Sequence, residues 1–336
     1  MSAIETNDLT KEFDGLTAVN SLNLKIEEGE LFGLLGPNGA GKTTIIKMLS
    51  TLIKPSSGSG RVAGYDIQGE RDKVRQSIGI VFQDISLDTE LTGWENLDFH
   101  ARMYGMEKEL RKERIAEVLK LVSLEDKADQ FVKYYSGGMQ RRLEIARGLM
   151  HYPKVLFLDE PTLGLDAQTR HVLWDYIKEL ARREKITIIL TTHYMDEADY
   201  LCDRIGIVDY GKIVVLGTSK ELKEKVGEDL ISLEITGRAS SADSVFEGLD
   251  GVLAVNIHDN TVDLSVKNAE KRIPLIIETS RRAGIEISSV NMRKPTLEDV
   301  FLHYTGRTIR GEGASGRDMA KQDMRNRRQL WGGRKK

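Results

Sequence analysis

Short apolar runs alternate with stretches of helical periodicity over residues 1–222. Continuous apolar strands that alternate with helices are typical of a sheet buried on both faces in an α/β domain. The stretch 204–217 predicts two short strands about the turn Asp209-Tyr210-Gly211. The predicted strands lie at 31–36, 78–82, 155–159 and 186–192, and examples of the predicted helices lie at 111–124 and 169–183.

The pattern changes at the polar segment 223–229, which we interpret as a connector. The order strand, helix, strand, strand, helix, strand that follows is typical of a small ferredoxin-like α+β domain, expected over 230–305. A last predicted helix, 296–304, begins with Pro-Thr and carries Glu298 in its cap region. The six elements of the predicted domain lie at 230–236, 242–249, 252–258, 261–266, 273–283 and 285–291.

The composition predicts the class of protein and its cellular compartment. Hydrophobic residues make up 40% and charged residues 30% of the 336 positions, the mixture of an ordinary globular protein of about two domains. The longest uncharged stretch, 31–41, has 11 residues, fewer than the ~20 that a membrane helix needs. The N-terminus is acidic from Glu5 onward, unlike a signal peptide. The only cysteine, Cys202, agrees with a reducing compartment, so we expect the protein in the cytosol.

Charge is distributed unevenly along the chain. The formal net charge is −3, but residues 306–336 carry ten Lys or Arg and three Asp or Glu, which leaves +7 there and −10 on the other residues. We expect 306–336 to be a disordered basic tail, and contact of this tail with anionic lipid is a further hypothesis.

The first candidate site follows the apolar run at 31–36. The motif G-x-x-x-x-G-K-[ST] occurs there between a predicted strand and a predicted helix, the context of a nucleotide phosphate loop. Its glycines let backbone N–H groups point at phosphate oxygens, and the helix N-terminus adds a favourable dipole. We expect Lys42 to contact the β- and γ-phosphates and the Thr43 hydroxyl to bind Mg²⁺. The predicted phosphate-binding residues are Gly36, Pro37, Asn38, Gly39, Ala40, Gly41, Lys42, Thr43 and Thr44.

The second candidate is the end of the apolar strand 155–159, which continues into Asp159 and Glu160. The carboxyl end of a strand in such a sheet is where ligands bind. Asp159 is placed to bind Mg²⁺, directly or through water, and Glu160 is placed to activate the attacking water as a general base. Together with the phosphate loop, this pair predicts a nucleotide hydrolase.

A third motif, 135–140, narrows the class of hydrolase. Ser136 is placed to cap a helix, so that the N–H groups behind it form a second anion-binding end. The segment resembles the signature motif of ABC ATPases, although Tyr135 stands where Leu is usual. In that family the signature of one subunit closes over the γ-phosphate bound to the other subunit. The resemblance therefore implies nucleotide contacts from Ser136, Gly137, Gly138 and Gln140.

Four further positions resemble motifs of the same family. Gln83 resembles the Q-loop glutamine, which contacts Mg²⁺ and water and senses the membrane subunits. Asp166 resembles the D-loop aspartate, although Leu163 stands where Ser is commoner. His193 resembles the switch histidine that contacts the γ-phosphate. Phe13 resembles the aromatic residue that stacks on adenine, with a position in the core as the alternative.

The resemblance covers about residues 3–222. It implies an ABC nucleotide-binding domain at 1–222, a P-loop NTPase cassette with a RecA-like core and a helical signature subdomain. One phosphate loop and one signature imply two chains, most simply a homodimer, around two ATP with Mg²⁺. We expect the domain 230–305 to be regulatory or dimerising rather than cargo-binding.

The segments 135–147, 163–166 and 295–307 resemble the daunorubicin/doxorubicin-resistance type of ABC subunit. This implies an exporter of drugs or other lipophilic cargo, with a multi-span permease as a separate chain and the ATPase on the cytoplasmic side of the membrane. A soluble ABC ATPase acting on nucleic acid is the alternative, for which the basic cluster at 325–328 could be cited. The heptad segments usual in such repair ATPases are missing, and ABC translation factors usually carry two cassettes per chain. A scaffold for iron–sulfur assembly is disfavoured because the chain has one cysteine.

Overall fold

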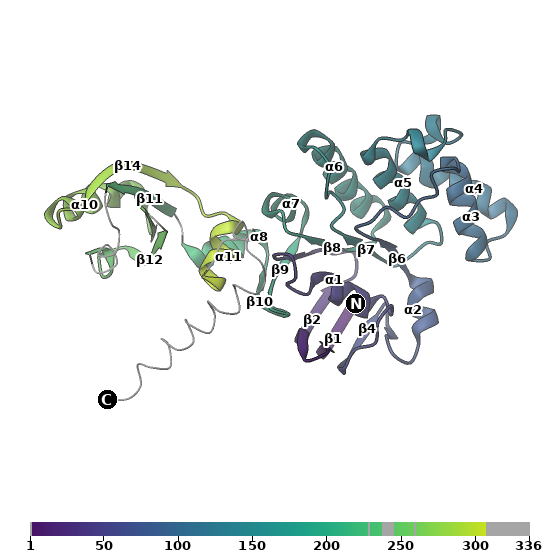
Figure 1. Cartoon of the computed structure of the whole chain (residues 1–336), viewed down its shortest axis with the longest axis horizontal. Helices are drawn as coiled ribbons and strands as arrows, with labels where there is room; N and C mark the ends of the chain where they lie inside the picture. The colour runs from purple at the N-terminus through teal and green to yellow at the C-terminus, as the bar shows by residue number, and fades with distance from the viewer. Residues whose placement is uncertain (1, 228, 237–244, 259, 307–336) are drawn as a thin grey trace.

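The computed structural model describes residues 2–227, 229–236, 245–258 and 260–306. Figure 1 shows a larger cassette and a smaller C-terminal domain, with helices α8 (Ser219–Val226) and α11 (Leu297–Thr305) between them. The predicted basic tail is 306–336, and all of it except Gly306 lies outside the described residues.

A six-stranded sheet forms the centre of the cassette. Its inner strands pair in parallel, whereas the edge strand β10 pairs antiparallel with β9. Every residue of the three strands β3, β7 and β8 is buried, which explains their continuous apolar sequences. The predicted buried strands and the 204–217 hairpin are therefore confirmed. In sheet order the strands are β10 (Lys212–Gly217), β9 (Arg204–Asp209), β3 (Leu31–Leu35), β8 (Thr187–Thr192), β7 (Val155–Asp159) and β6 (Ile78–Val81).

A second, antiparallel sheet packs beside this centre. Its buried side chains share one hydrophobic cluster with Phe32 of the central sheet and Ile45 of helix α1. The sheet therefore lies over the phosphate-loop side of the core. Its strands, in sheet order, are β2 (Leu16–Glu27), β1 (Ser2–Phe13), β4 (Ser57–Val62) and β5 (Tyr65–Asp66).

The helices fall into two groups. A helical subdomain consists of α3, α4 and α5, and its buried residues form one cluster with β7, β8 and α6. The other helices of the cassette follow strands of the two sheets. Helix α4 ends earlier than the predicted 124 because Ser123 adopts a left-handed φ of 53°. The helices are α1 (Lys42–Leu49), α2 (Arg71–Ser77), α3 (Gly93–Met103), α4 (Lys108–Leu121), α5 (Gly137–Leu149), α6 (Ala167–Glu184) and α7 (Met195–Leu201).

The C-terminal domain has the predicted ferredoxin-like topology. Its four strands are antiparallel, and helix α10 (Ala269–Arg282) packs on the face that carries Leu233 and Leu264. Of the predicted helix 242–249, residues 242–244 lie outside the described part, and Val245 and Phe246 are helical. In sheet order the strands are β12 (Val252–His258), β13 (Thr261–Val266), β11 (Asp229–Thr236) and β14 (Glu286–Arg293).

The segment interpreted as a polar connector, 223–229, is mostly helical. Helix α8 continues to Val226, and its buried residues Leu222 and Val226 lie one turn apart on one face. This face packs against α11, whose residues Val300 and Phe301 belong to the same cluster. The two linking helices thus form a shared core between the cassette and the small domain.

The cap of α11 also differs in detail from the expectation. The Thr296 side chain accepts a hydrogen bond from the backbone N–H of Asp299, and the Asp299 carboxylate accepts one from the Thr296 N–H. The capping acid is therefore Asp299 rather than Glu298. Arg293 pairs with the same carboxylate, which ties the end of β14 to the start of α11.

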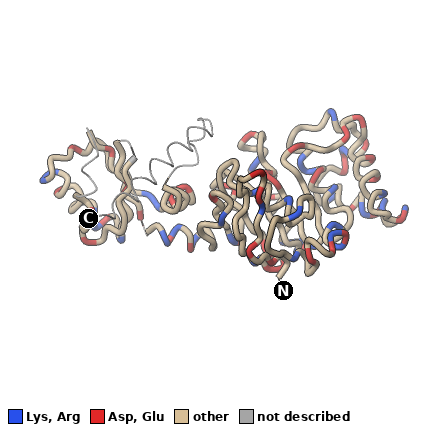
Figure 2. Tube along the Cα trace, turned by 60° about the horizontal axis from the view of Figure 1, so that its bottom comes forward, with Lys and Arg blue, Asp and Glu red and all other residues tan. Residues whose placement is uncertain are grey.

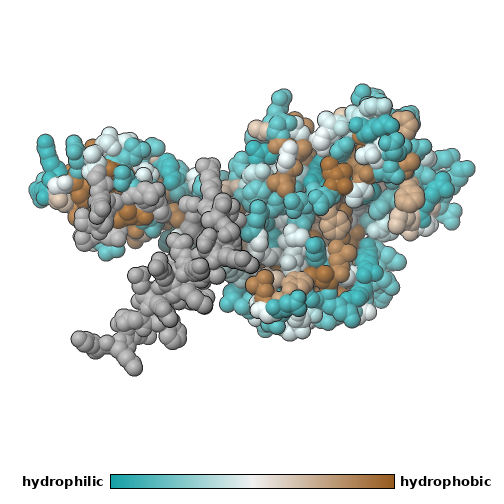
Figure 3. All heavy atoms as spheres, viewed as in Figure 1, coloured by the Kyte–Doolittle hydropathy of each residue, from teal (hydrophilic) through white to brown (hydrophobic). Residues whose placement is uncertain are grey.

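The surface is mixed in charge and largely hydrophilic. Figure 2 shows Lys and Arg interspersed with Asp and Glu over both domains. In Figure 3, hydrophobic residues gather along the middle of the cassette, between the helical subdomain and the sheets. In the part of the chain that the structure describes, no helix is both long and apolar enough to cross a membrane.

Candidate functional site

The phosphate loop connects β3 with α1, as the sequence predicts. Gly41 lies at the N-cap of α1 with a φ of 104°, and a Cβ atom there would lie 2.4 Å from the carbonyl oxygen of Ala18. A glycine is therefore required by both backbone conformation and space. A pocket of about 300 Å³ lies over this loop, lined by Ala18, Pro37, Asn38, Gly39, Gly41, Lys42, Thr43, Thr44, Gln83, Glu160 and Leu163.

Lys42 points into the fold of the loop. Its side chain is 4% exposed, and its ammonium donates hydrogen bonds to the carbonyl oxygens of Gly36 (2.5 Å) and Pro37 (3.0 Å). The same nitrogen lies 3.4 Å from Oε1 of Glu160. A buried cation held at the N-terminus of a helix is suited to a phosphate ligand.

Asp159 contacts the pocket residue Thr43 but does not itself line the pocket. Oδ1 of Asp159 accepts hydrogen bonds from the hydroxyls of Thr43 (3.1 Å) and Thr191 (2.5 Å). Among the described residues, no group of three or more His, Cys, Asp or Glu is arranged to bind a metal. One carboxylate and one hydroxyl nevertheless fit Mg²⁺, which usually keeps several waters and takes further ligands from substrate phosphates.

Glu160 occupies a strained position at the end of β7. Its φ is 49°, and its N–H donates to the carbonyl (3.2 Å) and hydroxyl (3.0 Å) oxygens of Thr191. Oε2 lies 2.9 Å from Nδ1 of His193. Burial opposes ionisation of this carboxyl, but the hydrogen bond and charge of His193 and the charge of Lys42 outweigh it and lower the pKa of Glu160. An ionised carboxylate is the form that a general base needs.

The signature segment begins α5, as predicted from its sequence. The Ser136 hydroxyl accepts a hydrogen bond from the Met139 N–H at 3.3 Å, and Ser136 and Gly137 are exposed. Tyr135, the departure from the usual leucine, is buried and donates its hydroxyl to the Lys127 carbonyl. Ser136 does not line the phosphate-loop pocket. Within one chain, therefore, the described structure does not bring the signature and Lys42 to the same pocket.

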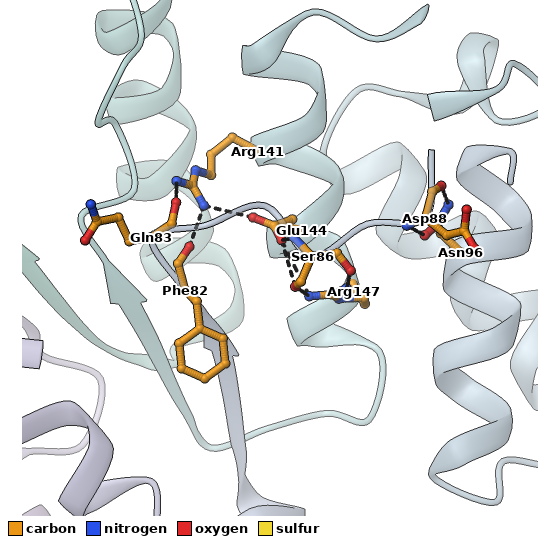
Figure 4. A network of polar contacts seen from close by, with 8 residues as sticks. All are labelled: Phe82, Gln83, Ser86, Asp88, Asn96, Arg141, Glu144 and Arg147. Carbon is orange, nitrogen blue, oxygen red and sulfur yellow. Dashed lines mark hydrogen bonds and ion pairs between the residues drawn. The ribbon is translucent and has the colours of Figure 1, made fainter. Parts of the chain in front are cut away.

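The segment after β6 is tied to the signature helix by buried charges. Figure 4 shows Arg141 of α5 directed at the backbone carbonyls of Phe82 and Gln83, both at 2.6 Å. Arg141 also pairs with Glu144 at 2.8 Å, and Glu144 accepts the Ser86 N–H at 2.7 Å. Gln83 thus has its backbone held by α5 while it lines the phosphate-loop pocket. This coupling joins the Q-loop region to the signature helix in one chain.

Phe13 and Asp166 lie outside the phosphate-loop pocket of their own chain. Phe13 ends β1 and is 44% exposed, so the core alternative for this residue is wrong. It pairs with Leu16, two residues before the pocket residue Ala18. Asp166 is exposed and caps α6 through the Thr169 N–H at 2.9 Å. Their contacts with nucleotide stay predictions.

Several residues of the site region were not predicted from the sequence. Thr191 supports both Asp159 and Glu160, and the arginine–glutamate pair of α5 holds the Q-loop region. A signal for the pair exists, because Arg141 and Glu144 interrupt the apolar face of α5 and are 3% and 0% exposed. Their partners lie 58 and 59 residues away in the chain, which local patterns do not reveal.

The sheet, the loop and the acidic strand end define a P-loop nucleotide-binding domain. A family model described as "ABC transporter" matches residues 19–163. A second, described as "ATP-binding protein DrrA1-3-like, C-terminal domain", matches 217–305. The linearmycin resistance ATP-binding protein LnrL of Bacillus subtilis is 39% identical over 91% of this chain and 99% of that protein. The chain belongs to the ATP-binding subunits of ABC transporters, whose ATP hydrolysis is coupled to transport.

Other relatives and solved structures agree with this family. The daunorubicin/doxorubicin resistance ATP-binding protein DrrA of Streptomyces peucetius is 40% identical over 90% of this chain and 92% of that protein. The Nod factor export ATP-binding protein I of Rhizobium etli is 37% identical over 92% of this chain and 95% of that protein. CbiO1 of Clostridium perfringens, part of the transporter complex cbiONQ, superposes with a TM-score of 0.62 at 31% identity, covering 67% of this chain and 94% of that chain. Its coverage corresponds to an ABC cassette without the small C-terminal domain.

Proposed function

We propose that two copies of this chain enclose two ATP molecules and drive a separate membrane permease that exports a drug or another lipophilic compound. Two of the relatives are named for drug resistance, one to linearmycin and one to daunorubicin and doxorubicin. A third is named for Nod factor export. The nucleic-acid alternative has no support among these relatives. The observation that carries the proposal is the separation, within one chain, of the phosphate-loop pocket from the exposed signature at Ser136.

Each nucleotide is held by the phosphate loop of one copy and the signature of the other. Lys42 and the loop N–H groups bind the phosphates, and Phe13 stacks on the adenine. Ser136, Gly137, Gly138, Gln140 and Asp166 of the second copy complete the contacts. This arrangement is supported by a solved ATP-binding cassette bound to ADP and Pi, described as dimeric, which has a TM-score of 0.58 and 29% identity to this chain.

Hydrolysis uses the acid at the end of β7. Thr43, Asp159 and Gln83 are the residues that would hold Mg²⁺, and the ion would neutralise charge on the phosphates. Glu160 takes the proton of the attacking water, and its lowered pKa keeps it ionised for this role. His193 orients Glu160 through the 2.9 Å contact and reaches the γ-phosphate from the end of β8.

The permease docks beside the Q-loop region on helix α3. Phe99 and Met103 lie one turn apart on α3 and are 61% and 72% exposed, and Ile85 is 43% exposed. Asn96 of α3 bonds the backbone of Asp88 at 2.9 Å, which ties α3 to the segment that follows Ile85. Exposed large apolar side chains in a cluster mark interaction sites. Docking here connects cargo movement to Gln83 through the buried Arg141 contacts.

The small C-terminal domain regulates or supports pairing of the cassettes. Its helix α11 lies beside α7, the helix that follows the switch residue His193. The two helices pack in one hydrophobic cluster, and a groove of about 610 Å³ opens beside them, lined among others by His193, Tyr194 and Thr296. Movement of the domain is thereby transmitted to the nucleotide site.

The protein works on the cytoplasmic side of the membrane, held there by the permease. The basic tail, 306–336, adds contact with anionic lipid, at about 1 kcal/mol per basic residue near the surface. Truncation after Arg307 is expected to reduce salt-sensitive binding to liposomes that contain anionic lipid. Unchanged binding would remove this part of the proposal.

The permease and cargo are tested by purification of the chain with the multi-span protein encoded beside it. Lipophilic drugs are expected to stimulate the ATPase activity of that complex, and Phe99→Glu is expected to abolish the complex without changing ATP binding. Leu253→Glu, at a position 52% exposed in the small domain, is the matched control. A complex that forms equally well with Phe99→Glu would refute the docking surface, and ATPase activity unaffected by any lipophilic compound would count against drug export.

A further inference from the structure

Two carboxylates in the described chain are completely buried, Glu144 and Glu197, both 0% exposed. Glu144 pairs with arginines. Glu197 differs, since no ion pair to it occurs among the described residues and its Oε2 atom is buried without a hydrogen-bond partner. Burying a carboxyl group costs free energy unless hydrogen bonds to the group compensate for its lost contact with water.

Oε1 of Glu197 carries two close hydrogen bonds, and the Thr192 side chain also interacts with the carboxyl group. Oε1 accepts the hydroxyl of Thr162 at 2.8 Å and the indole N–H of Trp174 at 2.9 Å. Both donors are buried, at 0% and 2% exposure. If Glu197 were removed, two buried donors would lose their acceptor, which is costly for each.

These three residues come from three segments that each carry a predicted nucleotide-site residue: Glu160, Asp166 or His193. Thr162 lies two residues after Glu160, in the loop that leads to Asp166. Trp174 belongs to α6, the helix that Asp166 caps, and Glu197 lies in α7, four residues after His193. A single carboxyl oxygen therefore joins the acidic loop, the D-loop helix and the switch segment.

We propose that Glu197 is a positioning residue for ATP hydrolysis, which holds the loop 160–166 and the switch segment in register through Thr162 and Trp174. The contact between Glu160 and His193, at 2.9 Å, spans the same two segments. A shift of α7 against the loop would change that contact directly. Since Glu197 does not line the phosphate-loop pocket, we expect the shift to leave ATP binding largely intact.

The role requires a hydrogen-bond acceptor rather than a negative charge. Burial raises the pKa of Glu197, and the hydrogen bonds from Thr192, Thr162 and Trp174 only partly oppose this. Glutamine keeps the accepting oxygen and the shape of the side chain, whereas methionine keeps a similar length without an acceptor. The pair of substitutions therefore separates hydrogen bonding from packing.

The test is steady-state Mg-ATP hydrolysis by the full chain. Glu197→Met is expected to lower kcat at least tenfold with KM for ATP within threefold of wild type, and Glu197→Gln to restore kcat to within threefold. Thr162→Val is expected to lower kcat in the same way. Because both substitutions remove the same hydrogen bond, the double variant Glu197→Met/Thr162→Val is expected to have a kcat no lower than that of the more impaired single variant. Glu179→Met, which makes the same change on the exposed face of α6, is expected to behave as wild type.

The outcomes that would overturn the proposal are distinct. They are a wild-type kcat in Glu197→Met, a Glu197→Gln variant as impaired as Glu197→Met, or a loss that lies in KM instead of kcat. Thermal unfolding identifies a Glu197→Met chain that fails to fold. In that case Thr162→Val decides, because it removes one hydroxyl and keeps the side-chain shape, and a kcat within twofold of wild type would contradict the positioning role.

Discussion

The buried pair Arg141–Glu144 offers the sharpest test of how the Q-loop region is held. Replacing Arg141 by Met removes the hydrogen bonds to the Phe82 and Gln83 carbonyls and leaves Glu144 0% exposed with reduced compensation. Breaking a buried pair by removal of one partner costs about 3–5 kcal/mol. For a cassette of this size each kcal/mol corresponds to about 2–4 °C in Tm. We therefore expect Tm of the cassette to fall by about 6–20 °C.

The double variant Arg141→Met/Glu144→Leu gives the diagnostic comparison. It leaves no uncompensated charge in the pair, so it is expected to be more stable than the sum of the two single variants predicts, by at least about 2 kcal/mol. Differential scanning calorimetry of the full chain measures these shifts. Arg183→Met, which breaks the exposed pair with Glu179, is the control and is expected to change stability by less than about 1 kcal/mol.

The reasoning would be refuted by either of two results. The first is a single variant that loses less than about 1 kcal/mol, because the pair would then not be the support that its burial indicates. The second is a double variant whose loss equals the sum of the singles within about 0.5 kcal/mol. Additivity would mean that Arg141 and Glu144 act independently, despite their separation of 2.8 Å.

Two further predictions concern pH and nucleotide affinity. Burial, with the charges of Arg147 and His151, lowers the pKa of His100 to about 4. The unfolded chain therefore protonates at His100 more readily than the folded chain, and stability is lost as pH falls from about 7 towards 4. In urea titrations across that range, wild type is expected to lose up to about 3 kcal/mol more than His100→Phe, and parallel curves would contradict this cause. Phe13→Ala is expected to weaken ATP binding by about 1–3 kcal/mol through lost stacking, with little change in Tm because Phe13 is 44% exposed. Unchanged affinity for a fluorescent ATP analogue would exclude Phe13 as the adenine contact.

The fold could be predicted best for strands that are buried on both faces. The strands β3 and β7 agree with the apolar runs to within one residue, because strands covered on both faces have continuous apolar sequences. Within the predicted connector 223–229, residues 223–226 are helical, which its polar sequence did not indicate. Its polar composition concealed Leu222 and Val226, which are spaced for one helical face and gain a partner only when α11 returns from far along the chain.

The candidate site divides in the same way. Lys42, Thr43, Gln83 and Glu160, predicted from separate motifs, line one pocket. The groups that brace them were not predicted, because their contacts depend on tertiary structure. Trp174 and Glu197 lie 23 residues apart on two helices, and neither carries a local pattern that relates it to the other. Sequence motifs indicate the residues that contact ligands more readily than the residues that hold them in place.

The central claim is that the active site is shared between two chains, and its most direct measurement is the mass of a hydrolysis-impaired variant with nucleotide. Glu160→Gln keeps the size of the side chain and removes the general base, so bound ATP persists. With Mg-ATP, analytical ultracentrifugation is expected to give a species of twice the 37.8 kDa chain mass, and a monomer without ATP. Adding Ser136→Arg to this variant is expected to abolish the dimer while ATP still binds. A monomer at saturating Mg-ATP, or a dimer that survives Ser136→Arg, would contradict the shared site.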